Sequence, residues 1–409
     1  MKIYFDNLEH GKSNLSHLES NGDKTWWVVA PGSILKGELT QMNVTYYPLS
    51  DIDEPGVYFI DVNGDPNWWT GQAGDQGPEH VLRYLPENIL QLVRSKKLRI
   101  VICADREGGP MINSFINGFA ATTSAMYDMN LPKGSVLITQ GNKNIEKDYV
   151  KWLDGHDPMF EVMYSNHFGN IFWDNKLPNK PLISTAIENP NAKDYNSLNR
   201  VYRTHRGAHF CKLVTENILD KGLVSGNAVR MSDAGAAGLA GCKTATLNRI
   251  FRTRFPRFID GDWSVTNAAN QYNFEVYSNS LLSVITETIF IDNTVFLTEK
   301  LFKPITLGHP FIVIAGAGTL NGLKELGFEV DFLGFGTDYD NIVDPALRFN
   351  KIHHILKSWV NTSREYKIEK IKESMPAIEH NFKRIKEVNF YHDAIREALK
   401  RSEVYYAQN

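Results

Sequence analysis

Short apolar runs alternate with longer amphipathic segments along almost the whole chain, and this alternation restricts the fold more than any other feature. In the first half, the residues between these runs recur at near-helical spacing, so helices are predicted at 78–97, 112–129 and 144–155. Strands are predicted at 2–5, 25–31, 56–62, 98–105, 135–141 and 160–166. Strands that alternate with helices predict a parallel sheet covered by helices on both faces.

The second half repeats this pattern after a segment rich in proline and asparagine, residues 174–197, which we interpret as an interdomain linker. A helix is predicted at 204–222 with Gly222 as its C-terminal signal. The segment 225–271 is less regular. A charged, helical tail follows at about 363–403, with Pro376 as a kink or restart. Further strands are predicted at 280–288, 310–316 and 330–335, with helices at 298–308 and 320–327.

A chain of 409 residues suits two domains. We therefore expect an α/β fold with two Rossmann-like domains facing across a cleft and a C-terminal helix that packs back. The expected ranges are 1–175, 195–375 and 376–409. The formal net charge of −3 argues against a tail-driven nucleic-acid binder, although a local basic groove would not show in that total.

The three cysteines, Cys103, Cys211 and Cys242, show no disulfide or metal-binding spacing, which favours a reducing, intracellular compartment. The N-terminus turns polar after six residues and does not read as a signal peptide, and no apolar run reaches the length of about 18 residues that a membrane span needs. No protein partner is evident. We expect a cytoplasmic protein.

The segment "FLTEKLFKPITLGHPFIV" (296–313) places Thr298, Glu299 and Lys300 at the start of a predicted helix. Thr298 and Glu299 suit a plain capped helix, but a lysine in the first turn opposes the helix dipole. A lysine fits there if an anion binds the helix start, and a carboxylate beside it suits a pair of sugar hydroxyls. The two open interpretations are a capped helix and a nucleotide site at the carboxyl edge of a sheet.

A second basic group lies at another predicted helix start. Arg200, Arg203, His205 and Arg206 fall within "SLNRVYRTHRGAHF". Such a cluster is usually a solvated basic face, but at a helix N-terminus it can also bind a pyrophosphate.

Taken together, "SLLSVITET…FLTEKLFKPITLGHPFIV" and the arginine cluster resemble a group of GT-B glycosyltransferases found mainly in tailed phages and some bacteria. They resemble the α-1,3-fucosyltransferases more distantly. The resemblance covers about residues 195–345 and is strongest over 283–313. It implies that Glu299 binds the nucleotide ribose and Lys300 the diphosphate, that Glu287 lies near the sugar or ribose, and that Arg203 or Arg206 reaches the diphosphate. The segment "ITET" lacks the fucosyltransferase F-E-N-S pattern, so fucose is not assumed.

The resemblance also implies that no metal is required and no cofactor is tightly bound, with a nucleotide sugar, UDP-sugar favoured, as donor. The "DYD" of Asp338–Asp340 is interpreted as structural and not as a metal-binding D-x-D. The segment 237–244, "AGLAGCKT", lacks the G-K pair and the preceding strand of a phosphate loop.

The first half is then expected to hold the acceptor and the catalytic base. Asp105 follows a predicted strand and precedes a glycine pair, so it is the first candidate for the base, although it also suits a turn cap. His167 is the second candidate, and a retaining mechanism would need neither. Arg106 and Glu107 are adjacent acceptor candidates.

Aromatic and basic residues predict further acceptor contacts. Trp68 and Trp69 on a polar loop can stack on a sugar or an extruded base, or can belong to the core. Arg252 and Arg254 in "NRIFRTRFPRF" are interleaved with phenylalanines, as on a phosphate-backbone surface or an ordinary amphipathic segment.

The resemblance implies a glycosyltransferase and points to phages, the basic segment 248–258 suits a DNA backbone, and nothing suggests membrane attachment. On these grounds we expect the acceptor to be a hydroxymethylated pyrimidine in phage DNA. Two alternatives stay open. One is transfer to a cell-surface glycan or glycolipid precursor. The other is a non-catalytic nucleotide- or DNA-binding protein on a transferase fold.

Overall fold

The structure is a computed structural model, and it forms two compact units: Met1–His167 with Asn389–Asn409, and Phe168–Val388. The expected domain ranges stay a prediction, because compactness alone does not decide where an independently folding domain begins. The described residues are 1–5, 39–61, 80–104, 112–166, 168, 177–226, 232–257, 259, 272–290 and 294–408.

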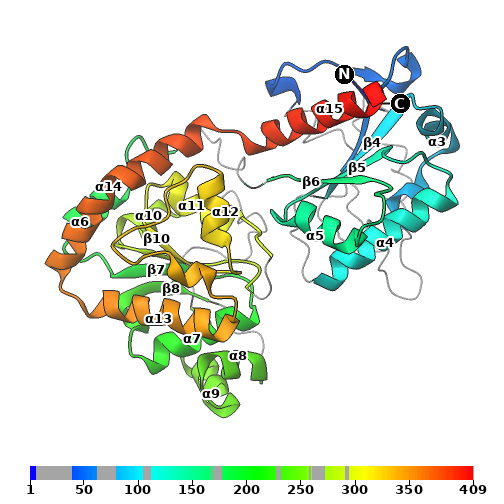
Figure 1. The fold of residues 1–409 in the computed structure, drawn as a ribbon. Helices are drawn as coiled ribbons and strands as arrows, with labels where there is room; N and C mark the ends of the chain where they lie inside the picture. The colour runs from blue at the N-terminus through cyan, green and yellow to red at the C-terminus, as the bar shows by residue number, and fades with distance from the viewer. Residues whose placement is uncertain are drawn as a thin grey trace. The chain divides into compact units, whose positions relative to one another are not determined.

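A parallel six-stranded sheet forms the centre of the first unit, with strand order β2-β1-β3-β4-β5-β6. Figure 1 labels β4, β5 and β6 of this sheet. Because β1 lies between β2 and β3, the winding of the chain reverses there, which makes a topological switch point. The strands are β1 (Lys2–Phe5), β2 (Tyr46–Pro48), β3 (Gly56–Asp61), β4 (Leu98–Ala104), β5 (Val136–Gln140) and β6 (Glu161–Tyr164).

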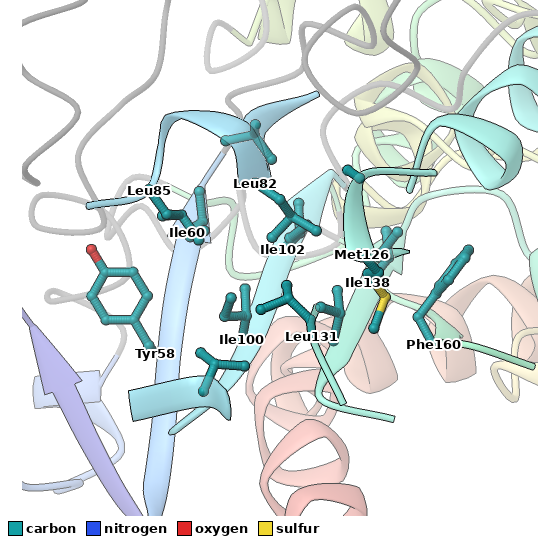
Figure 2. Close-up of a cluster of buried hydrophobic side chains, with 14 of the residues drawn as sticks. Tyr58, Ile60, Leu82, Leu85, Ile100, Ile102, Met126, Leu131, Ile138 and Phe160 are labelled. Atoms are coloured by element: carbon teal, nitrogen blue, oxygen red, sulfur yellow. The ribbon is translucent and has the colours of Figure 1, made fainter. Parts of the chain in front are cut away.

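Both faces of this sheet are apolar, so the strands read as continuous hydrophobic runs. All seven residues of β4 are buried. Because successive side chains point to opposite faces, Ile100 and Ile102 enter one core cluster and Val101 enters the other. Figure 2 shows the first cluster, which includes Ile102, Met126 and Phe160.

Helices α3 (Glu87–Arg94), α4 (Ile112–Asp128) and α5 (Ile145–Leu153) belong to this unit. The single helix predicted at 78–97 is wrong, because the described part of that stretch is a 3-10 turn, η3 (Val81–Tyr84), followed by α3. Pro86 explains the break, since it disfavours helical backbone at Leu85 and lacks an amide donor. A second 3-10 turn, η2, spans Leu49–Asp51.

Helix α15 (Phe390–Gln408) returns to the first unit, so the expected packing back of a C-terminal helix is observed. Tyr391 and Ile395 join the core cluster on the second face of the sheet. Arg99 of β4 donates to the Ser402 hydroxyl at 3.3 Å, and the Tyr406 hydroxyl donates to the Gly56 carbonyl at 2.7 Å. These contacts tie the helix to the ends of β3 and β4.

The second unit contains a parallel four-stranded sheet of order β10-β9-β7-β8. The winding reverses between β9 and β7, so this sheet also has a switch point. Its strands are β7 (Tyr195–Leu198), β8 (Gly222–Ser225), β9 (Ser283–Thr286) and β10 (Phe311–Ile314). The predicted α/β class, with two Rossmann-like parallel-sheet domains, is confirmed.

Nine helices are described in this unit, and α14 continues through Pro376, where the sequence predicts a kink or restart. The helices are α6 (Ile183–Glu188), α7 (Thr204–Thr215), α8 (Ala234–Ala240), α9 (Thr244–Arg254), α10 (Phe274–Ser278), α11 (Glu299–Thr306), α12 (Thr319–Glu325), α13 (Pro345–Asn361) and α14 (Arg364–Glu387). Two 3-10 turns, η5 (Leu219–Lys221) and η7 (Asp338–Asn341), complete the unit's described elements.

Three local predictions are wrong in this unit. Helix α7 ends at Thr215, and Gly222 opens β8, where a Cβ atom would lie 2.4 Å from the ring of Tyr195. The strand predicted at 330–335 forms turns, with Gly334 at a left-handed φ of 71°. The predicted linker 174–197 contains α6 and most of β7.

Candidate functional site at the carboxyl edge of the second sheet

The residues singled out in the second half meet where β7 and β9 end. Strand β7 leads through residues 199–203 into α7, and β9 leads through Glu287 toward α11. These neighbouring strands flank the switch point of the sheet. Open parallel α/β sheets bind their ligands at this position, because two loops diverge there and leave helix N-termini facing outward.

Glu287 holds the start of α11 against the end of β9. Its Oε2 accepts from the Thr298 hydroxyl at 2.7 Å and the Thr288 amide at 2.9 Å, and its Oε1 accepts from the Thr298 amide at 3.0 Å. The side chain is buried, and burial raises the pKa of Glu287 although Lys300 opposes that shift. A buried carboxylate with three donors positions the two segments that it joins.

Thr298 caps α11 as the sequence predicts, accepting from the Lys300 amide at 3.3 Å. Lys300 and Glu299 form an ion pair of 2.5 Å between Nζ and Oε1. The ammonium group also donates to the hydroxyls of Thr288 and Thr298. Burial by itself would raise the pKa of Glu299, but the charge of Lys300 outweighs it and the pKa is lowered.

The side chains of this pair are partly open to solvent, 28% exposed for Lys300 and 15% for Glu299. A ligand group can therefore reach either side chain from solvent and replace the other as its partner. The lysine that opposes the helix dipole is neutralised by its neighbour, and the pair offers one cation and one carboxylate side by side.

Arg206 is buried and binds the carbonyl groups that surround the switch point. Its Nη1 donates to Val201 at 2.7 Å, and its Nη2 donates to the carbonyls of Thr286 and Glu287. Burial lowers its pKa to about 10, so it stays charged at neutral pH. Within the described residues, its Nε lies buried with no hydrogen-bond partner.

The other members of the basic cluster differ from Arg206. Arg203 is exposed at the N-cap position of α7, and no side chain caps that helix in the described part of the chain. Arg200 is partly buried. His205 is buried against Phe290 and lies 2.8 Å from the Glu287 carbonyl. Burial, with the Arg206 charge adding to it, lowers the pKa of His205 to about 3, so this imidazole is neutral and adds no positive charge.

Two residues that the sequence analysis missed hold the loop 199–203 in place. Asp233 accepts from the Tyr202 hydroxyl at 2.9 Å and the Thr204 hydroxyl at 3.0 Å. Asn199 is buried and accepts from the Thr286 hydroxyl. Asp233 also caps α8, and that cap is the only local signal in the sequence that could have marked it.

Several predicted site residues are not brought into this site. Arg252 is exposed on α9, and Arg254 pairs with Asp220 at 2.6 Å. Arg257 also pairs with Asp220, at 3.0 Å. The remaining candidates lie outside the described residues, and they are Trp68, Trp69, Asp105, Arg106, Glu107 and His167.

The Asp338–Asp340 segment serves the fold. It forms the 3-10 turn η7, and the buried Asp340 carboxylate accepts from the Asn321 amide at the start of α12. Burial raises the pKa of Asp340. Across the described ranges, no group of three or more His, Cys, Asp or Glu residues could hold a metal ion.

A search of the described helices for a membrane span finds none that is both long and apolar enough.

No protein-family model and no curated protein matches the sequence. Among solved structures, an α,α-trehalose-phosphate synthase (UDP-forming) from Burkholderia vietnamiensis is 10% identical with a TM-score of 0.44, covering 98% of both chains. The trehalose-6-phosphate synthase OtsA is 12% identical with a TM-score of 0.40 over 98% of both chains. The N-terminal domain of Candida albicans trehalose-6-phosphate phosphatase is 9% identical with a TM-score of 0.41, covering 98% and 96%. Likeness at this level identifies neither a substrate nor a reaction.

Proposed function

We propose that the protein is a glycosyltransferase that takes its sugar from a nucleotide-sugar donor. The observation that carries the proposal is the pair of helix starts at one switch point: α7 with Arg203 and Arg206, and α11 with Glu299 and Lys300. A nucleoside diphosphate needs cations for its phosphates and a paired acceptor for its ribose hydroxyls, and these helix starts supply both.

In this proposal the diphosphate replaces Glu299 as the ion-pair partner of Lys300. The freed carboxylate then accepts two hydrogen bonds from the ribose hydroxyls, so neither member of the ion pair is left without a partner. Arg203 supplies further positive charge from its exposed position at the start of α7, and the buried Nε of Arg206 is an additional donor. A UDP-sugar is the favoured donor.

Glu287 receives a different role from the one that the resemblance implies. Both of its carboxylate oxygens accept hydrogen bonds from Thr288 or Thr298. We therefore assign it as a positioning residue that fixes α11, and through α11 the ammonium group of Lys300. Thr298 shares this role, because it links Glu287 to the helix.

The transfer step breaks the bond between the anomeric carbon and the phosphate oxygen and forms one to the acceptor oxygen. In an inverting reaction a base removes the proton of the acceptor hydroxyl, and Asp105 and His167 remain the candidates. Asp105 is the residue that directly follows β4 in the sequence. Trp68, Trp69, Arg106 and Glu107 remain proposed acceptor contacts.

The acceptor proposed from the sequence is a hydroxymethylated pyrimidine in DNA, with a glycan acceptor as the alternative. The ion pairs of Arg254 and Arg257 with Asp220 reduce the free positive charge of the basic segment. DNA is therefore tested as a possible acceptor, and the donor-site proposal does not depend on it.

The test is a donor screen with the full chain. UDP-, GDP-, ADP- and CMP-sugars are supplied with and without hydroxymethylcytosine DNA, and release of nucleoside diphosphate is measured. Release that rises only with modified DNA supports both donor and acceptor proposals, and slow release indifferent to DNA supports the donor site alone. If no donor is bound or turned over, the proposed function is wrong.

Lys300→Ala is the matched site variant, and Lys324→Ala on the exposed last turn of α12 is its control. Loss of a charge-assisted contact to phosphate is expected to weaken binding of the nucleoside diphosphate by about 10- to 100-fold. The control is expected to bind as the unaltered protein does. Equal binding by Lys300→Ala would remove Lys300 from the site.

A further inference from the structure

Two cysteines that are far apart in the sequence meet on α7, the helix whose N-terminus belongs to the proposed site. Cys211 lies on α7 and Cys242 follows α8, 31 positions later, and their Sγ atoms are 3.0 Å apart. Both are free thiols. The sequence spacing predicted no pairing, because the contact arises only when α8 packs against α7.

The backbone around both cysteines is held in place. Helix α8 ends at Ala240 and is capped by Gly241 at a left-handed φ of 67°, and the Cys242 amide then donates to the Ala237 carbonyl at 2.9 Å. Cys211 is buried in the second half of α7. The two sulfur atoms therefore meet through fixed helices, and a bond of about 2.05 Å requires only a small approach.

Helix α8 contacts α7 at both of its ends. At its start, Asp233 accepts from the Thr204 hydroxyl in the first turn of α7. At its end, Cys242 contacts Cys211 two turns further along α7. The thiol contact and the Asp233–Thr204 hydrogen bond thus help hold α8 alongside the helix whose N-terminus carries Arg203.

We propose that Cys211 and Cys242 form a redox-modifiable dithiol, which a small-molecule disulfide of the glutathione type oxidises to an intramolecular disulfide. The Cys242 thiolate attacks one sulfur of the oxidant, forms a mixed disulfide and releases one small thiol. Cys211 then attacks the Cys242 sulfur, and its proton passes to the departing small thiolate, which leaves as the second small thiol. Two protein S–H bonds and one small-molecule S–S bond are exchanged for one protein S–S bond and two small thiols.

The order of attack follows from exposure. Cys242 is partly accessible, whereas Cys211 is buried and burial raises the pKa of its thiol to about 12. An external oxidant therefore reaches Cys242 first, and Cys211 acts as the resolving thiol. Cys103 is buried on β4 in the first unit and serves as an internal control.

Closing the disulfide replaces a contact by a covalent tie between α7 and α8. Because Asp233 at the start of α8 also binds Tyr202, the tie restrains the loop 199–203 in addition to α8. Oxidation is thus expected to slow amide hydrogen exchange at 199–206 and 234–240. This inference does not depend on the proposed transferase activity.

The test uses the full chain, reduced and then treated with oxidised glutathione. Free thiols are expected to fall from three to one, and peptide mapping is expected to find Cys211 joined to Cys242 with no glutathione retained. The melting temperature is expected to rise by about 5 °C, and a reducing dithiol should reverse the change. Cys103→Ser should behave in the same way, whereas Cys242→Ser should keep all its remaining thiols free.

A stable glutathione adduct on Cys242 would overturn the proposal, as would unchanged thiols after treatment or a linkage that includes Cys103. Because mapping is done on the unaltered sequence, a variant that fails to fold does not affect the decision. A donor screen that fails while the disulfide forms would reject the proposed function and leave this inference standing.

Discussion

The two sheets share a parallel topology with one switch point, but their interiors are chemically different. In the first sheet the central strands β4 and β5 read "LRIVICA" and "VLITQ" and are buried throughout. In the second sheet β7, β8 and β9 read "YNSL", "GLVS" and "SVIT", and the serine and asparagine side chains are buried as well. One sheet is stabilised mainly by apolar burial, and the other adds a buried polar network.

The polar network of the second sheet connects its strands to the surrounding helices. Asn196 on β7 donates to the Ser280 and Ser283 hydroxyls at 2.9 and 3.1 Å. Ser197 contacts His209 at 3.1 Å, which in turn contacts His353 at 3.1 Å. Apolar burial is not directional, whereas hydrogen bonds fix orientation. We infer that the sheet carrying the candidate site uses buried hydrogen bonds to fix the orientation of its strand ends.

The largest expected difference between the units is their response to acid. Four buried histidines in the described part of the second unit have pKa values lowered by burial, to about 3 for His205 and His209, to about 4 for His309, and well below the usual value for His353. In the described part of the first unit, His80 shows such a shift. Nearby positive charges lower these pKa values further. Arg206 and Arg203 act on His205, and Lys212 acts on His353.

The sign follows from proton uptake. Unfolded histidines titrate near pH 6.5, so below that pH the unfolded chain binds protons that the folded unit does not. The buried neutral histidines contribute fully to the free energy of unfolding above about pH 6.5. Below that pH the free energy of unfolding falls by on the order of 1 kcal/mol per histidine for each pH unit. Hydrogen exchange between pH 7 and 5 should show amides of β7 and β9 losing more protection than those of β3–β5. Equal losses in both sheets would contradict the comparison.

Ile102→Ala tests the apolar sheet. Ile102 is fully buried in the core of Figure 2, and its truncation leaves a cavity expected to cost about 3 kcal/mol. Ile102→Val is the matched control, with an expected cost of about 1 kcal/mol. Denaturant unfolding measures both. A cost for Ile102→Ala no larger than that of the control would show that apolar packing does not dominate this sheet.

Asn196→Ala tests the polar sheet with a smaller expected effect. Removing the amide takes a buried donor from the hydroxyls of Ser280 and Ser283 and is expected to cost about 2 kcal/mol. Asn191→Ala, at an exposed position before β7, is the control and should be nearly neutral. Comparable unfolding curves for the two variants would mean that the buried hydrogen bonds add no net stability.

Asp220→Ala has the smallest expected effect. Its pairs with Arg254 and Arg257 are largely exposed to solvent, so their loss is expected to cost about 0.5 kcal/mol or less. The variant frees two arginines, and retention on a DNA column at low salt should increase. Unchanged retention would show that these ion pairs do not mask a nucleic-acid surface.

The same chemical difference explains what could be predicted from the sequence. Strands β3–β6 follow from short apolar runs between turn signals, a pattern that favours a buried strand. Strand β8 was missed because glycine and serine carry no strand signal, and the apolar run 330–335 was wrongly predicted as a strand because it is buried in turns. In both segments the conformation depends on contacts with distant parts of the chain and not on local propensity.

In the candidate site, the Thr298 cap was predictable because its partner is two residues away. The contacts of Asn199 with Thr286 and of Asp233 with Tyr202 could not be predicted, since each joins segments that only the fold brings together. The neutral state of His205 was hidden for the same reason, because its burial depends on Phe290 and Glu287 from another strand end.

The return of α15 to the first unit has a consequence for the order of synthesis. The apolar face of the first sheet that includes Val57 and Val101 is covered by Tyr391 and Ile395. A ribosome reaches α15 only after it has made the whole of the second unit, residues 168–388. During translation one apolar face of the first unit therefore stays exposed until the second unit has been made. A chaperone that binds hydrophobic surface is expected to bind the first unit in that interval.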